Sequence, residues 1–357
     1  MKKRMHRGIS LYPGLDRTPE ENLARLEQAA DLGFTDLFLS FHIPETDEKA
    51  FSRQVTPLLE RAAALGIRTT GDLVPGKAVP EQLTCLRLDD GYTPEAMADL
   101  QARYPTKILV LNASAVTEQQ LQAMEDAGVV LSRVEALHNF YPHPHTGLSE
   151  AYFRRQNDLL HGYGVKVGAF VPSQCGCRGP LYEGLPTLEK DRHRAVGLAA
   201  QHVLLLGADA VYIGDDAPSE AELQALANLN PEVVTLDLVT EEHTPLHAIL
   251  VTHVYETRPD QSEEVLRTTN SRQLWNNIEI PACPADTSSL FPLGSSLPIG
   301  TVTLDNKAYG RYKGELEITL TPLPSDPRVT ILGRIPEEEL FLLELLRGGR
   351  KFRINLE

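Results

Sequence analysis

The sequence lacks the features that mark membrane and secreted proteins. It contains no apolar run of the length that a membrane span requires. Its basic N-terminus, MKKRMHR, is followed by GISLYPGLD rather than by the apolar core of a signal peptide. Cysteine is scarce, with only four in 357 residues, at positions 85, 175, 177 and 283. So few scattered cysteines indicate free thiols in a reducing compartment. We therefore expect a cytoplasmic protein that does not bind membranes.

Basic residues are also few, with 34 Lys and Arg against 49 Asp and Glu and a net charge of −15. Nucleic acids and anionic membrane surfaces bind through basic patches, so neither is an expected partner. The Cys-x-Cys pair is a poor zinc spacing without a second pair. His143 and His145 have the surroundings of solvated loop residues, although His42, His138 and Asp215 could in principle converge on a metal. We expect neither a metal nor a cofactor, and the oligomeric state stays open.

Short apolar segments alternate with helical patterns over the first 230 residues. The predicted strands cover residues 7–14, 36–43, 68–74, 85–91, 107–114, 165–171 and 209–215, and the sixth lies within residues 129–138. Eight strand–helix units in this length predict a (β/α)8 TIM barrel, a fold of about 250 residues. A doubly wound sheet is the alternative, but no Gly-x-Gly-x-x-Gly follows the first strand.

The pattern changes after about residue 240. Segments 246–255, 301–304, 314–321, 328–334 and 351–356 are strand-like and are joined by turns that contain Pro and Gly, with one helix expected at 336–346. This predicts a small, mostly antiparallel β domain. We place the two domains at residues 1–238 and 239–357.

The period of two along each strand predicts which side chains face the barrel interior. In Leu86-Arg87-Leu88-Asp89 the leucines share one face, so Arg87 and Asp89 point inward. The same alternation places Ser10, Tyr12, Ser40, His42, Thr70, Asp72, Asn112 and Ser114 inside. Chemistry in these barrels takes place at the carboxyl ends of the strands. Six polar residues hold such positions: Asp72, Asp89, Asn112, His138, Arg178 and Asp215. Carboxylates and amides with one Arg and one His suit a polyhydroxylated substrate.

Two loops follow the sixth and seventh predicted strands, HNFYPHPHTGL at 138–148 and the Gly- and Pro-rich segment 172–189. In the second, Arg178 lies between Cys177 and Gly179, in the loop where these barrels often bind phosphate. We expect Arg178 to bind an anion of the substrate, and the alternative is a bracing ion pair with Glu183 or Glu189. Purely structural roles also stay open for an internal Arg87–Asp89 ion pair and for Asp72 and Asp215 as capping residues.

Several motifs together resemble one known family. They are, in order, GISLYPG, FHIPE, LRLDDG, LNAS, HNFYPHPHTGLS, AFVP, RGPLYEGLPTLE, YIGD and TVTLDNKAYGRYKGELEI. They resemble the domain-of-unknown-function 871 family, which includes bacterial 6-phospho-N-acetylmuramidases (glycoside hydrolase family 170). The resemblance implies a TIM barrel followed by a cyclophilin-like β domain. It also implies a cytoplasmic glycosidase of peptidoglycan recycling, which cleaves the β-1,4 bond of N-acetylmuramic acid 6-phosphate–N-acetylglucosamine.

Motif positions of this family are occupied by Asp72, Asp89, His138, Asn139, Tyr141, Arg178 and Asp215. The chain departs from the pattern at His143, where Arg is usual, and at His145, where Glu is usual. These departures weaken the prediction that the loop 138–148 binds a phosphate.

We expect Asp72 and Asp89 to be the catalytic carboxylates, because most glycosidases use a pair of them. Asn112, His138, Asn139, Tyr141, Arg178 and Asp215 are the expected substrate-binding residues. Retaining, inverting and substrate-assisted routes all stay open. A sugar-phosphate isomerase or aldolase is an alternative, although Lys107 and Lys166 lie at the wrong strand ends for a Schiff base. A non-catalytic carbohydrate-binding protein is another.

Overall fold

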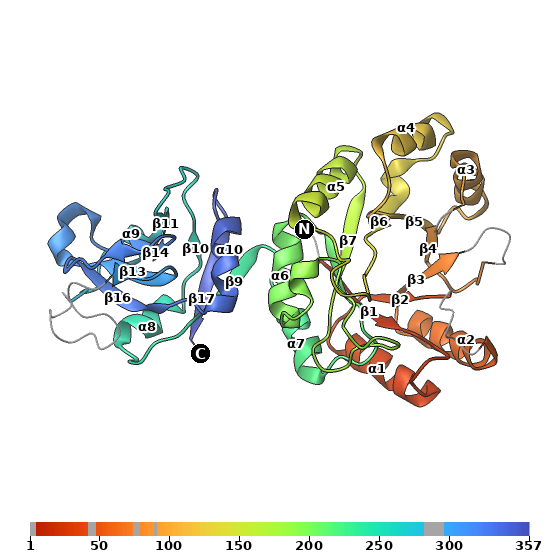
Figure 1. Ribbon diagram of the computed structural model, residues 1–357, viewed down its shortest axis with the longest axis horizontal. Helices are drawn as coiled ribbons and strands as arrows, with labels where there is room; N and C mark the ends of the chain where they lie inside the picture. Colours follow the sequence, from red (N-terminus) through yellow and green to blue (C-terminus); the bar gives the residue numbers. More distant parts are fainter. Residues whose placement is uncertain (1–4, 42–47, 74–78, 89–90, 282–295, 357) are drawn as a thin grey trace. The chain divides into compact units, whose positions relative to one another are not determined.

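The computed structural model describes residues 5–41, 48–73, 79–88, 91–281 and 296–356. The chain divides into two compact units, Met1–Leu229 and Asn230–Glu357 (Figure 1). In the part of the chain that the structure describes, no helix has the length and apolar character needed to cross a membrane.

The first unit is a closed barrel in which each of eight strands pairs in parallel with the next and β8 pairs with β1. The strands are β1 (His6–Leu11), β2 (Asp36–Leu39), β3 (Arg68–Leu73), β4 (Cys85–Leu88), β5 (Ile108–Asn112), β6 (Val134–Leu137), β7 (Lys166–Val171) and β8 (Ala210–Ile213). This confirms the predicted TIM barrel.

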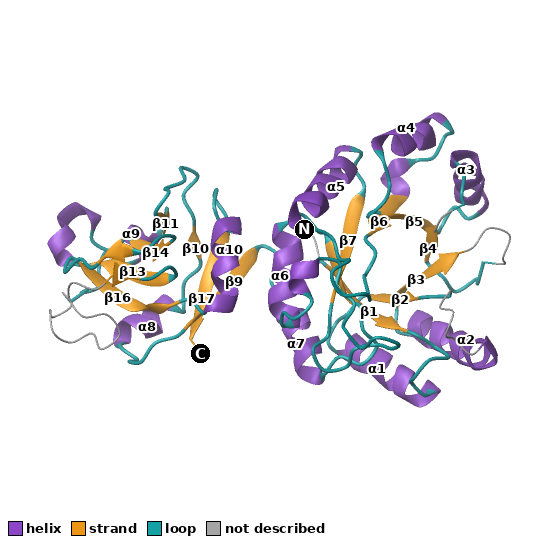
Figure 2. Cartoon of the chain, in the orientation of Figure 1, coloured by secondary structure: helices purple, strands orange, loops and turns teal. Residues whose placement is uncertain are grey.

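Helices surround the ring of strands (Figures 1 and 2). They are α1 (Pro19–Asp31), α2 (Glu48–Ala64), α3 (Pro94–Arg103), α4 (Glu118–Asp126), α5 (Glu150–Gly162), α6 (Val196–Leu205) and α7 (Glu220–Asn228). Several of these helices begin at a polar N-cap residue that can be recognised in the sequence. Thr18, Thr117 and Ser219 each accept a hydrogen bond from the third helical residue and donate one in return from their own backbone N–H. These caps fix where each strand-to-helix loop ends.

Aromatic and aliphatic side chains fill the barrel interior near the carboxyl ends of the strands. Tyr12, Phe38, Val110, Leu137 and Phe170 are buried together, as the two-residue period requires. Phe140, from the loop after β6, packs edge-on against Phe38 and Phe170, at ring-centroid distances of 6.1 and 5.1 Å. This apolar layer forms the floor beneath the carboxyl ends of the strands.

The second unit contains sheets of three, four and two strands, ordered β10-β17-β9, β11-β14-β13-β16 and β12-β15. The strands are β9 (Val233–Leu238), β10 (Tyr255–Glu256), β11 (Val265–Arg267), β12 (Ser296–Leu297), β13 (Thr301–Asp305), β14 (Leu316–Thr319), β15 (Leu323–Pro324), β16 (Val329–Arg334) and β17 (Lys351–Leu356). The helices are α8 (Pro245–Leu250), α9 (Ser271–Leu274) and α10 (Leu340–Leu345). All pairs are antiparallel except β9 with β17, so the mostly antiparallel domain is confirmed.

Helix α8 and strand β9 differ from what the sequence predicts for this unit. The strand predicted at 246–255 is wrong, since Pro245–Leu250 forms helix α8 and strand β10 begins at Tyr255. Thr244 caps this helix, Pro245 occupies its first turn, and Leu246 and Leu250 are both buried. Strand β9 lies before the boundary expected at residue 238, yet it pairs with β17 and belongs to the second unit.

Candidate active site

A buried ion pair joins β3 and β4 at their carboxyl ends. Asp72 and Arg87 are direct partners in the strand register, and Arg87 Nη1 donates a hydrogen bond to Asp72 Oδ1 over 2.8 Å. Ser40, from the residue after β2, donates to Asp72 Oδ2 over 3.0 Å. Three neighbouring strand ends therefore hold one carboxylate in a fixed orientation. The partner of Arg87 is Asp72, where the sequence had suggested Asp89, and Asp89 lies outside the described residues.

The loop 138–148 reaches this ion pair through Asn139. Arg87 Nη2 donates to Asn139 Oδ1, so the guanidinium bridges a carboxylate and an amide. The backbone N–H of Asn139 donates to Ser114 Oγ over 2.9 Å, and its carbonyl accepts from Thr187 Oγ1 over 2.9 Å. Asp72, Arg87 and Asn139 thus form one connected polar group at the carboxyl ends of the barrel strands.

Tyr141 and Asn112 lie partly exposed near this group. Burial raises the pKa of the Tyr141 phenol, while a hydrogen bond with Ser114 and the positive charge of Arg87 lower it. Asn112 uses its Oδ1 to accept the backbone N–H of Ser114 over 3.0 Å, which closes a tight turn after β5.

His138 does not line the site. It is fully buried between β6 and α5, where its ring packs 4.5 Å from that of Phe153 and its nitrogens contact Ser114 Oγ at 3.1 Å and Asn157 Oδ1 at 3.0 Å. Burial lowers the pKa of His138 to about 4. Because Leu137 faces the barrel interior, the next residue faces the helices. His138 therefore anchors the start of the loop, and a direct contact with substrate is not supported.

Arg178 lies over the aromatic floor of the barrel mouth. Its Cζ is 4.5 Å from the ring centroid of Tyr12 and 5.4 Å from that of Phe140, and its Nε donates to the carbonyl of Gly179 over 3.0 Å. Within the described residues no carboxylate forms an ion pair with it. The suggested bracing pair with Glu183 or Glu189 is not formed. A buried guanidinium that forms no ion pair with the described residues is suited to bind an anion.

Asp215 organises the loop that carries Arg178. Its carboxylate is fully buried and accepts three backbone N–H bonds, from Ser173 over 2.9 Å, Arg178 over 2.9 Å and Leu185 over 3.2 Å. Burial raises the pKa of Asp215 to about 6, although these hydrogen bonds oppose the shift. Asp215 therefore acts behind the site, and a direct contact with substrate is not supported.

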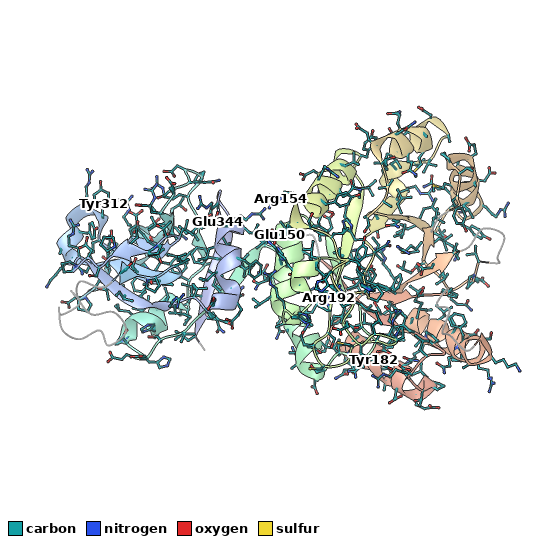
Figure 3. All side chains as sticks on the ribbon, in the orientation of Figure 1. Glu150, Arg154, Tyr182, Arg192, Tyr312 and Glu344 are labelled. Carbon is teal, nitrogen blue, oxygen red and sulfur yellow. The ribbon has the colours of Figure 1, made fainter. Side chains whose placement is uncertain are left out.

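Arg192 and Glu189, which the sequence does not predict to pair, connect the loops 138–148 and 172–189. Arg192 Nε and Nη2 donate to the two oxygens of Glu189, each over 2.7 Å. The same guanidinium donates to four backbone carbonyls, those of residues 141 and 143 in one loop and 183 and 184 in the other. Glu189 in turn accepts the backbone N–H of His145 and of Gly147. We call Arg192 and Glu189 the loop clip, and Figure 3 labels Arg192. The Glu of the LPTLE motif was the only sequence signal.

Metal binding finds no support in the residues that the structure describes. They contain no group of three or more His, Cys, Asp or Glu side chains with the geometry to hold a metal ion. His143 and His145 are exposed on the loop 138–148.

The fold and this arrangement define the chain as a TIM-barrel protein with a polar candidate site. A closed eight-stranded barrel carries an oriented carboxylate, an amide and the cation of Arg178 at the carboxyl ends of its strands. TIM-barrel enzymes have their sites at this end.

Family models match both units. Residues 7–228 match the model described as 6-phospho-N-acetylmuramidase, N-terminal, and residues 234–355 match its C-terminal counterpart. The chain therefore belongs to the 6-phospho-N-acetylmuramidase family, in agreement with the resemblance found in its motifs. No curated protein matches the sequence.

Two solved structures are similar over nearly the whole chain. An uncharacterized protein of B. cereus is 27% identical with a TM-score of 0.87, and the match covers 99% of this chain and 100% of the other. A conserved protein of unknown function from Enterococcus faecalis is 31% identical with a TM-score of 0.69, over 99% and 96% of the two chains.

Proposed function

We propose that this protein hydrolyses the β-1,4 bond between N-acetylmuramic acid 6-phosphate and N-acetylglucosamine, as the family description suggests. The observation that carries the proposal is the oriented carboxylate of Asp72 together with the guanidinium of Arg178 at the same end of one barrel. The first supplies a group for glycoside chemistry, and the second supplies a cation for an anionic sugar.

Asp72 is suited to the role of the charged carboxylate. It already accepts hydrogen bonds from a guanidinium and a hydroxyl, which hold it in place as a base, a nucleophile or a partner for the positive charge that develops on the sugar ring. The complementary acid, which protonates the leaving oxygen, is proposed to be Asp89. The substrate's own N-acetyl oxygen could replace one protein carboxylate.

Arg178 is proposed to bind the 6-phosphate. Its guanidinium can hold two phosphate oxygens at once, and it follows β7, where these barrels often bind phosphate. In a protein with a net charge of −15, such a cation offsets the repulsion of a dianion. Asn139, Tyr141 and Asn112 are proposed to bind sugar hydroxyl and acetamido groups.

We also propose that the reaction takes place in the cytoplasm, in the recycling of peptidoglycan. The free thiols of Cys85, Cys175 and Cys177 support a reducing compartment. The expected partner is a small phosphorylated disaccharide, and the acidic sequence argues against nucleic acids and membranes.

Substitutions of Asp72 test the chemical part of this proposal. Asp72→Asn keeps the shape of the side chain and is expected to lower kcat by about a hundredfold or more, as for the loss of a catalytic acid or base. Asp99→Asn, at an exposed position of α3, is the matched control and should leave kcat unchanged. Near-normal turnover of the Asp72 variant would remove this residue from the mechanism.

Substitution of Arg178 tests the choice of substrate. Arg178→Ala is expected to raise KM for the phosphorylated disaccharide and to abolish its advantage over the unphosphorylated form. If Arg178 only supported the loop, both substrates would suffer equally and the melting temperature would fall. An unchanged preference for the phosphorylated sugar would refute the assignment.

A further inference from the structure

Two neighbouring apolar side chains are exposed on the loop that carries Arg178. Leu181 is 46% exposed and Tyr182 is 60% exposed, the largest value among the large apolar and aromatic side chains that the structure describes. Figure 3 labels Tyr182 among the loops of the barrel unit. An exposed aromatic side chain beside a candidate ligand site is a feature of binding surfaces.

The ring of Tyr182 is held in a fixed place. Its hydroxyl donates to Asp16 Oδ2, in the loop after β1, over 3.2 Å, and its backbone N–H donates to the carbonyl of Arg178 over 3.2 Å. The hydroxyl end of the ring also packs over Gly179, where a Cβ would come within 3.0 Å of the Tyr182 oxygen. The side chain is therefore exposed and oriented at the same time.

The backbone at Tyr182 is strained. Its φ of 56° lies in the left-handed region, which is costly for a bulky residue that is not glycine. Such conformations persist where surrounding contacts impose them, and they cluster at functional sites. Here the contacts with Asp16 and Arg178 impose it. The outcome is an aromatic ring presented to solvent four residues after the proposed phosphate-binding cation.

We propose that Tyr182 is a specificity-determining residue that stacks on the apolar face of the sugar ring without the phosphate, here N-acetylglucosamine. This inference rests on the proposed function. A neutral sugar offers no charge to an acidic protein, so its recognition depends on shape, hydrogen bonds and contact with its C–H face. An aromatic ring supplies a flat apolar surface for that face. Because Asp16 already orients the ring, little side-chain freedom is lost on binding.

Binding to matched ligands tests this proposal without turnover. The probes are the sulfur-linked analogue of the phosphorylated disaccharide, which resists hydrolysis, and N-acetylmuramic acid 6-phosphate alone. Isothermal titration should show that the wild-type protein binds the disaccharide analogue about tenfold more tightly than the monosaccharide, the order of one aromatic stacking contact. Tyr182→Ala should abolish this preference and leave the Kd of the monosaccharide unchanged.

Two control variants separate the ring from its surroundings. Tyr182→Phe keeps the ring and loses the hydrogen bond to Asp16, so it should bind the disaccharide analogue less tightly than the wild type but more tightly than Tyr182→Ala. Tyr312→Ala removes another tyrosine, 40% exposed, from the second unit and should have no effect. The proposal is overturned if Tyr182→Ala keeps the preference, if it weakens both ligands equally, or if Tyr182→Phe is as damaging as Tyr182→Ala.

The outcome is distinguishable from a failure of the proposed hydrolysis. Each variant is also incubated with the natural oxygen-linked disaccharide. Cleavage by the wild-type protein together with an unchanged preference in Tyr182→Ala overturns only the stacking role. Absence of cleavage together with a preference that Tyr182→Ala abolishes overturns only the hydrolysis. Absence of binding to both probes overturns both.

Discussion

Replacing Arg192 with methionine should both destabilise the barrel unit and impair its site. The substitution keeps an unbranched side chain of similar reach and removes the guanidinium. Arg192 is almost fully buried, and it contacts both oxygens of Glu189 and four backbone carbonyls in two loops. Without it, the loops 138–148 and 172–189 lose their charged link and keep only hydrogen bonds such as that from Thr187 to the carbonyl of Asn139. Those loops carry Asn139, Tyr141 and Arg178.

The magnitude follows from the burial of the pair. Removing one partner of a buried ion pair typically costs about 3–5 kcal/mol. The Glu189 side chain is 27% exposed and keeps its two backbone N–H donors, which places the expected loss near the lower end, about 3 kcal/mol. For a unit of this size that corresponds to a fall in Tm of about 6–12 °C. We expect kcat/KM for the phosphorylated disaccharide to fall by about tenfold, as misplaced binding groups reduce catalysis.

The assay is urea denaturation and thermal melting followed by circular dichroism, with kcat/KM measured on the same samples. Arg61→Met is the matched control, because Arg61 pairs with Glu27 over 2.7 Å on the surface with both side chains almost half exposed. Such a pair contributes less than about 1 kcal/mol. If the two variants lose equal stability, the clip is not a buried brace. If Arg192→Met melts early and keeps full kcat/KM, the clip does not position the site.

The dependence on pH gives an independent check of the clip. Hydrogen bonds from Arg192 and from two backbone N–H groups lower the pKa of Glu189 to about 2 from an ordinary value of 4.5. A carboxylate with a lowered pKa contributes stability that is complete above pH 4.5 and is lost as the pH falls toward 2. The stability difference between wild type and Arg192→Met should therefore shrink over that range, and a constant difference would contradict the assignment.

Three further predictions concern buried polar groups. Because burial lowers the pKa of His138 from 6.5 to about 4, its neutral form contributes stability that is complete above pH 6.5 and is lost as the pH falls toward 4. That is about 3 kcal/mol by the linkage relation, and urea titrations of His138→Phe should lack this slope. Burial raises the pKa of Asp215 from 3.8 to about 6, so its contribution is complete below pH 3.8 and is lost as the pH rises to about 6. The size is again about 3 kcal/mol, and Asp215→Asn should remove this opposite slope. Arg87→Lys should lower kcat about tenfold, because an ammonium group cannot bridge Asp72 and Asn139 as a guanidinium does; unchanged kcat would show that the bridge is dispensable.

Much of the barrel could be predicted because its strands obey a strict period of two. Arg87 and Asp72 were expected to face inward, and they do, because the neighbouring positions on their strands must be apolar to meet the helices. Their contact with each other could not be foreseen, since it depends on the register between β3 and β4. The sequence places His138 at the end of the sixth strand, but the alternation along that strand is ambiguous and does not predict which face His138 takes.

Contacts between loops that lie far apart in the chain could not be predicted from the sequence. The loop clip joins Arg192 to carbonyls about 50 positions earlier in the chain, and no periodicity encodes such a contact. The segment that forms helix α8 has the alternating polarity of a strand, and its Thr244-Pro245 start is the helix signal that competes with this pattern. The missed elements are short and their patterns ambiguous, whereas the elements of the barrel are regular.

The most direct test of the proposed function is a single incubation. Purified protein is mixed with N-acetylmuramic acid 6-phosphate–N-acetylglucosamine, and in parallel with the same disaccharide without phosphate, and the products are followed by mass spectrometry. We predict two monosaccharides whose summed mass exceeds that of the disaccharide by one water, formed faster from the phosphorylated substrate. A phosphorylated disaccharide that binds to the protein but stays intact after prolonged incubation would contradict hydrolysis and would leave a sugar-binding protein in its place.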